Sequence, residues 1–206
     1  MSEASHSKFE DIASNLALRT TVRNVALLNL GYFGVEFAVA LAIGSVSLFA
    51  DSVDFLEDAA INLLILAGLG FSPLRRAKLG MLLAVIILVP GLATLWTAWQ
   101  NFSDGRVPEA LPLSLTGLGA FAVNLMCARL LAPFRTTGGS LTRAAFLSAR
   151  NDVAANVAIV FAGLATAATS SQWPDLIVGL SIAALNAGAA LEVYQAARNE
   201  HVSAKP

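Results

Sequence analysis

The stretch that decides the fold is Ala50-Asp51-Ser52-Val53-Asp54-Phe55-Leu56-Glu57-Asp58, which carries four carboxylates within eight residues. It lies in a run, residues 46–70, whose other members are mostly Leu, Ile, Val, Ala, Phe and Gly. Such a run is typical of a membrane-spanning helix. An acid at mid-bilayer costs about 2.5–3.5 kcal/mol on insertion scales, so acids in such helices usually face the bundle interior and serve a function. We therefore expect an acidic stripe turned inward.

The spacing of the four acids assigns them to different faces of this helix. At about 100° per residue, Asp54 and Asp58 lie within about 40° of each other, with Asp51 on the same flank. Asp51 is interpreted as a neighbour of a site or as part of a proton pathway, or equally as a protonated acid near the outer end. Glu57 lies about 100° from Asp58, which predicts a structural or interface role for it.

The composition supports an all-α integral membrane protein. Of the 206 residues, 56% are hydrophobic and 13% are charged, and the mean hydropathy is +0.68; a soluble domain is less apolar. A net charge of −1 argues against nucleic acid as a partner. The single cysteine, Cys127, cannot form an internal disulfide.

The apolar pattern predicts six membrane-spanning helices, at 22–44, 46–70, 79–101, 110–132, 143–168 and 174–197. Nearly all lysines and arginines then fall at the ends that share one side with the termini, and only Arg106 falls opposite. The positive-inside rule therefore predicts that both termini are cytoplasmic. We expect a cytoplasmic tail at 1–21, a transmembrane domain at 22–198 and a second tail at 199–206, in the cell (inner) membrane. Residues 1–18 show no cleavable signal pattern.

The fifth predicted helix carries another deep acid, Asp152. It lies about 14 Å from the cytoplasmic end, while Asp54 and Asp58 lie about 12–18 Å from the outer end, so the two groups meet at one level. Three carboxylates at mid-membrane, with no lysine in either helix, are expected of a divalent-cation site. The alternative is a hydrogen-bonded cluster of protonated acids. Other buried polar residues are expected to bond between helices, namely Glu36, Asn62, Asn124, Asn156 and Asn186.

The run Gly44-Ser45-Val46-Ser47-Leu48-Phe49-Ala50-Asp51-Ser52-Val53-Asp54-Phe55-Leu56-Glu57-Asp58-Ala59 resembles the second-helix motif of the cation diffusion facilitator family, which exports divalent metals. The stretches Ser148-Ala149-Arg150-Asn151-Asp152 and Trp173-Pro174-Asp175-Leu176 are similar to the family's fifth and sixth helices, and Tyr32-Phe33-Gly34-Val35-Glu36-Phe37 precedes them. The resemblance covers essentially all six predicted helices.

The resemblance implies that Asp54, Asp58 and Asp152 are metal ligands. The family's usual His or Asp at the remaining position is Ser148 here, so the fourth donor is Ser148, Asn151 or water. The resemblance also implies a homodimer built through the helices. The family's cytoplasmic metal-binding domain is expected to be absent, because only eight residues follow the sixth helix.

These observations predict a transporter and not an enzyme, with no permanently bound cofactor. It would exchange a cytoplasmic divalent metal ion, Zn²⁺ first and otherwise Fe²⁺, Co²⁺, Mn²⁺ or Cd²⁺, for external protons; the direction comes from the resemblance. Two alternatives stay open. One is a metal-dependent intramembrane enzyme, since Asp51-x-x-Asp54 is similar to the start of the CDP-alcohol phosphotransferase motif, whose remainder is missing. The other is a non-transporting partner subunit.

Overall fold

The computed structural model describes residues 3–68, 78, 92–136 and 139–203, and this part of the chain is helical with short connections. Its elements are α1 (Glu3–Ile43), α2 (Val46–Gly68), a helical segment at 92–104, α4 (Ala110–Leu131), the 3-10 turn η1 (Ala132–Phe134), α5 (Gly139–Thr169) and α6 (Trp173–Ser203). The prediction of an all-α fold is confirmed. Most of the predicted helix at 79–101 lies outside the described residues.

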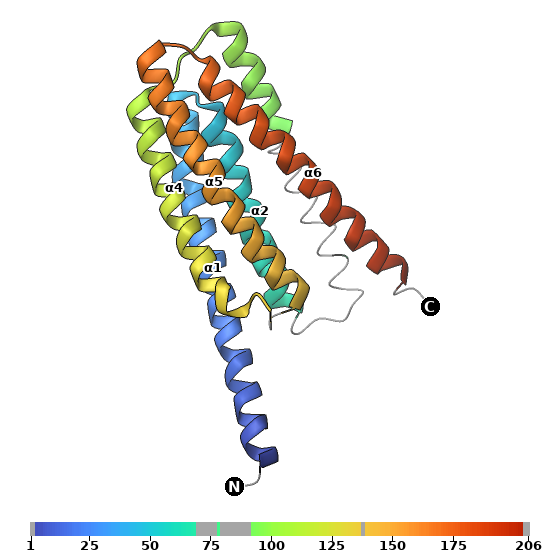
Figure 1. Ribbon diagram of the computed structural model, residues 1–206. Helices are drawn as coiled ribbons and strands as arrows, with labels where there is room; N and C mark the ends of the chain where they lie inside the picture. Colours follow the sequence, from blue (N-terminus) through green and yellow to red (C-terminus); the bar gives the residue numbers. More distant parts are fainter. Residues whose placement is uncertain (1–2, 69–77, 79–91, 137–138, 204–206) are drawn as a thin grey trace.

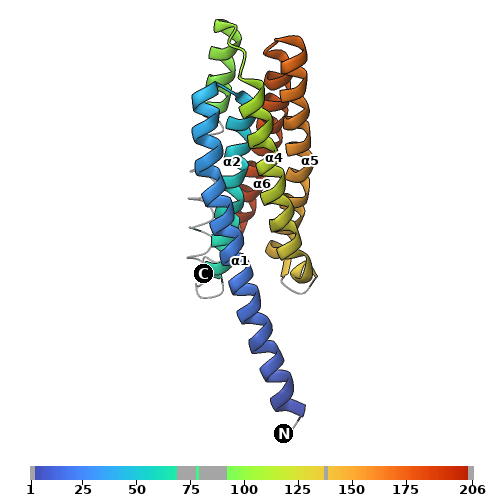
Figure 2. The same ribbon diagram turned by 90° about the vertical axis from the view of Figure 1, so that its left-hand side faces the viewer.

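The helices run up and down along one bundle axis (Figures 1 and 2). The most extensive packing joins α4 to α5 and α1 to α2. Helix α6 lies beside α2 where it begins and diverges from the bundle toward its C-terminal end (Figure 1). Helix α1 begins and α6 ends at the same end of the bundle, as an even number of spans requires (Figure 1).

Three of the described helices are long and apolar enough to cross a membrane by length and composition, at Asn15–Ile43, Ala110–Phe134 and Thr142–Thr169. Helix α2 has the length but carries four acids. Large apolar side chains cover the outside of the bundle; Leu111, Phe161 and Leu185 are 70%, 64% and 73% exposed. An apolar exterior around buried polar groups is the pattern of a protein whose solvent is lipid. The chain is thus an all-α, multi-pass membrane protein.

Among the described residues, two of the apolar clusters of the interior lie on either side of a polar layer. One cluster packs the N-terminal half of α1 against the N-terminal part of α5 and the C-terminal parts of α2 and α4. It includes Val22, Ile65, Leu131 and Ala149. The other lies toward the opposite end and includes Leu48, Leu113, Ile159 and Ile182. The residues between them along α1, α2 and α5 include the buried acids. Apolar packing at both ends therefore holds the helices that carry the polar groups.

The turn between α1 and α2 is tightly held. Gly44 adopts φ +69°, which favours glycine, and the Arg106 side chain packs where its Cβ would lie. Asn101 donates a hydrogen bond to the Gly44 carbonyl. The Ser45 hydroxyl accepts a hydrogen bond from the Leu48 N–H at 3.2 Å and so caps α2. The start of α2, one turn before its first acid, is fixed in place.

Candidate metal-binding site

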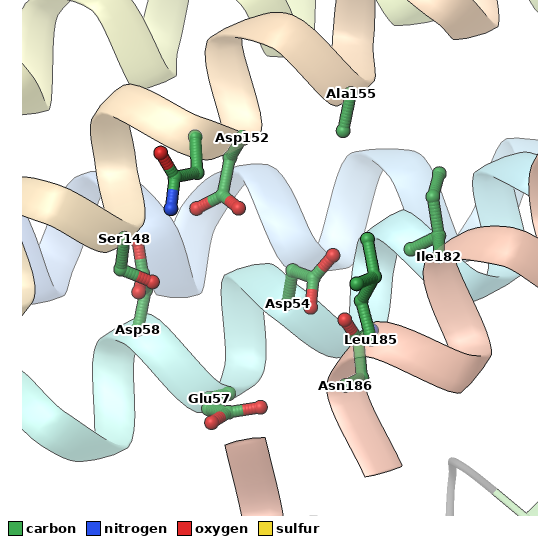
Figure 3. Close-up of a pocket in the computed structure, with 10 residues that line it drawn as sticks. Asp54, Glu57, Asp58, Ser148, Asp152, Ala155, Ile182, Leu185 and Asn186 are labelled. Carbon is green, nitrogen blue, oxygen red and sulfur yellow. The ribbon is translucent and has the colours of Figure 1, made fainter. Parts of the chain in front are cut away.

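A cavity of about 270 Å³ lies between α2, α5 and α6. Figure 3 shows that its polar side chains come from α2 and α5, and that α6 closes it with apolar groups and one amide. Its lining consists of Asp54, Glu57 and Asp58 from α2, Ser148, Asn151, Asp152 and Ala155 from α5, and Ile182, Leu185 and Asn186 from α6. The four residues expected to hold a metal ion, Asp54, Asp58, Ser148 and Asp152, thus share one cavity.

Helical spacing explains how two helices supply four donors. Asp54 and Asp58 are four residues apart, as are Ser148 and Asp152, so each pair occupies one face of its helix. The Ser148 hydroxyl donates a hydrogen bond to the Asp58 carboxylate. In Figure 3 the Asp152 carboxylate points from α5 toward α2, between Asp58 and Asp54. Asp54 and Asp58 on α2 therefore face Ser148 and Asp152 on α5 across the cavity.

The carboxylates surround the cavity without closing on one point. Among the described residues, no group of three or more His, Cys, Asp or Glu side chains lies close enough together to hold a metal ion in this arrangement. An ion bound here would draw α2 and α5 together or complete its shell with water oxygens. The assignment of Asp54, Asp58, Asp152 and Ser148 as ligands stays a prediction.

Glu57 differs from its sequence-based expectation. It was expected to point away from the acidic face, but it lines the same cavity as Asp54 and Asp58, and its Oε2 atom is buried with no hydrogen-bond partner among the described residues. The sequence predicted a site between α2 and α5 alone. The cavity also extends to α6, where Leu185 and Asn186 reach the flank of α2 that carries Glu57, so a wider arc of α2 faces it.

Asp51 does not line the cavity. It is completely buried, and its Oδ2 atom accepts a hydrogen bond from the Asn156 Nδ2 at 2.6 Å. Asn156 Oδ1 in turn accepts a hydrogen bond from Asn124 Nδ2 at 3.0 Å. The expectation that Asn124 and Asn156 bond between helices is confirmed. Asn186 likewise donates to the Ala50 carbonyl at 3.3 Å. For Asn62 the expectation is wrong, because the Asn62 amide donates to the Asp58 carbonyl of its own helix at 2.8 Å.

Asn151 lies at the edge of the cavity and is largely exposed. Its Oδ1 accepts a hydrogen bond at 3.4 Å from the Arg150 side chain, which is exposed and does not line the cavity. Ser148, by contrast, is partly buried and bonded to Asp58. The structure therefore favours Ser148 over Asn151 as the protein donor nearest to the acids, and water stays an alternative.

Two functional groupings were not anticipated from the sequence. Glu36 was expected to bond between helices, but its partner was not predicted; its carboxyl group faces that of Asp51 on α2 within hydrogen-bond range. Asp175, at the start of α6, binds the start of α2 through four hydrogen bonds. Both acids stood in the quoted family-like stretches, and their isolation among apolar residues was the available signal.

The fold and this site together define a multi-pass membrane protein with an acidic cavity inside its helical bundle. A comparison with protein families matches residues 22–198 to the cation efflux transmembrane domain. The chain therefore belongs to the cation efflux (cation diffusion facilitator) family, and it is a membrane transporter of metal cations. A comparison with curated proteins gave no match.

Proposed function

We propose that the protein exports Zn²⁺ or a related transition-metal ion from the cytoplasm in exchange for protons. The observation that carries the proposal is the cavity shared by Asp54, Asp58 and Asp152, three carboxylates from two helices. Among the residues that the structure describes, no lysine or arginine lines this cavity. A group of like charges without a fixed counter-charge needs a mobile cation or protons to neutralise it.

The donor chemistry suits a divalent ion. Carboxylate oxygens bind both Zn²⁺ and harder ions such as Mn²⁺. A tetrahedral zinc site needs four donors. Three carboxylates and the Ser148 hydroxyl supply four donor groups, all from residues that line the cavity. Zinc is the first candidate through the family resemblance, and Fe²⁺, Co²⁺, Mn²⁺ and Cd²⁺ fit the same donors.

Proton exchange follows from the same donors. A metal ion binds the deprotonated carboxylate, so an ion that enters must displace protons, and protons that return weaken the site. Alternating exposure of the cavity to the two sides of the membrane would then couple the two fluxes. The outward direction, the location in the cell membrane and a homodimeric assembly are part of the proposal and rest on the family resemblance.

The test is transport by purified protein in proteoliposomes with a zinc-sensitive dye. We expect Asp54→Ala, Asp58→Ala and Asp152→Ala each to reduce zinc flux at least tenfold, because each removes a ligand oxygen. The exposed acid Asp104 provides the control, since Asp104→Ala removes the same charge away from the cavity. Size-exclusion chromatography verifies folding. Flux like that of the wild type in any of the three cavity variants contradicts the assigned site.

A further inference from the structure

A second acidic group lies in the polar layer, apart from the metal cavity. It consists of Glu36 on α1 and Asp51 on α2, both 0% exposed, and neither lines the cavity. The two carboxyl groups face each other within hydrogen-bond range. Two carboxylates cannot bond to each other unless one of them carries a proton. The contact therefore identifies a place where a proton, or another small cation, is held between α1 and α2.

The surrounding hydrogen bonds indicate which of the two carboxyl groups carries the proton. Asn124 occupies the Oδ1 atom of Asn156, so the Asn156 amide nitrogen is turned toward Asp51 and donates to its Oδ2 at 2.6 Å. That bond favours Asp51 as the carboxylate. The other oxygen of Asp51 and both oxygens of Glu36 are buried and receive no donor from any other described residue. Glu36 is therefore the member that must hold the proton, and it donates it to Asp51.

No other described group near the pair can replace this proton. Tyr32 lies close to both acids, but its hydroxyl already donates to the Thr116 carbonyl at 2.6 Å. The other ionisable groups close enough to interact electrostatically with the pair are the cavity acids. These are Asp54, Asp58 and Asp152, and as acids they would repel a charged Glu36 or Asp51. Two uncompensated carboxylates at zero exposure would cost several kcal/mol each.

We propose that Glu36, bonded to Asp51, is a proton-binding site separate from the metal cavity, and that a metal ion in the cavity expels its proton. The proposal rests on the metal/proton exchange proposed above. Helix α2 carries Asp51 one turn from Asp54, and α5 carries Asn156 one turn from Asp152. A divalent charge bound at the cavity acids then favours the ionised pair, which releases one H⁺ and leaves both carboxylates charged beside the metal. On return, the proton restores the Glu36–Asp51 bond as the metal leaves.

The experiment is calorimetry of Zn²⁺ binding to the full-length protein in detergent, in buffers of different ionisation enthalpy and across pH. Glu36→Gln keeps the side-chain length and a donor for Asp51 but cannot titrate. We expect it to bind Zn²⁺ and to release about one proton fewer per ion than the wild type. The matched control is Glu109→Gln, which changes an exposed glutamate at the start of α4 and should release as many protons as the wild type.

The outcomes separate this inference from the proposed function. If the wild type binds no Zn²⁺ or releases no protons, the exchange mechanism itself is wrong. If the wild type releases protons and Glu36→Gln releases the same number, Glu36 does not exchange its proton and the pair is structural. If Na⁺ competes for the pair, Zn²⁺ binding will depend on Na⁺ in the wild type but not in Glu36→Gln, which overturns the proton assignment. Should Glu36→Gln not fold, Glu36→Met also removes the titratable carboxyl group and has the same expected proton deficit.

Discussion

Asp175 connects the first turn of α6 to the first turn of α2, and its removal should loosen this end of the bundle. Its carboxylate is 1% exposed and accepts hydrogen bonds from the Ser45 hydroxyl at 2.7 Å, the Val46 N–H at 2.7 Å, and the Ser47 N–H and hydroxyl at 3.2 and 2.6 Å. The negative charge also faces the positive end of the α2 dipole. Beside it, the Cα of Gly179 approaches the α2 backbone so closely that a Cβ would meet Val46 at 2.6 Å.

The expected cost follows from what each donor loses in Asp175→Ala. The two hydroxyls can partly compensate, because Ser45 Oγ and Ser47 Oγ lie 3.4 Å apart and can bond to each other. The N–H groups of Val46 and Ser47 have no such alternative among these contacts. A buried donor without an acceptor costs about 1–3 kcal/mol, so the two amides predict a loss of about 2–6 kcal/mol in the free energy of unfolding. Asp175→Asn should cost less, because its amide oxygen still accepts one or two bonds.

Unfolding in detergent micelles measures this loss, and hydrogen exchange locates it. The Val46 and Ser47 amides should exchange faster in Asp175→Ala, while amides in the α4–α5 pair should not change. Asp104→Ala, at an exposed acid, is the control for charge alone. A change in unfolding free energy below about 0.5 kcal/mol, with unchanged exchange at the start of α2, would show that Asp175 does not hold these helices together.

Two further predictions concern the cavity. Ser148→His should raise the affinity for Zn²⁺ relative to Mn²⁺, because it places a ring nitrogen one turn from Asp152, beside Asp58, and imidazole suits zinc. The ratio of the two apparent affinities in proteoliposomes measures this change. An unchanged ratio with intact transport would mean that position 148 does not face the metal. The wild type's Zn²⁺ affinity should fall as the pH falls, because protons compete for the carboxylate oxygens that bind the ion; a pH series of dissociation constants that shows no such trend contradicts proton exchange.

The acidic face could be predicted from the sequence because its signal is local. Four acids in a long apolar run have few interpretations in a membrane, and helical periodicity places Asp54 beside Asp58 and Ser148 beside Asp152 without knowledge of the packing. The two pairs line one cavity in the structure. Periodicity within a helix therefore predicted the faces, and the depth of each acid predicted which faces meet.

The parts that escaped prediction depend on how the helices are placed relative to one another. Glu57 lines the cavity because Leu185 and Asn186 of α6 reach the flank of α2 that carries it, a contact that no pattern within α2 encodes. Glu36 meets Asp51, and Asp175 meets the start of α2, across separations of 15 and about 129 residues. Such contacts follow from tertiary packing, whereas the sequence indicated only that these acids had to find a partner.

The polar layer is better explained by ion exchange than by stability. The apolar clusters on either side already hold α1, α2, α4 and α5 together, and buried carboxylate oxygens without donors weaken a fold. A purely structural layer would supply donors to those oxygens, yet in the described part of the chain Glu36, Asp51 and Glu57 all have a buried oxygen that no donor other than an acid proton reaches. Oxygens that must accept different cations in turn cannot all be paired permanently with protein donors. We therefore expect metal ions and protons to compete for the carboxylate oxygens of the polar layer.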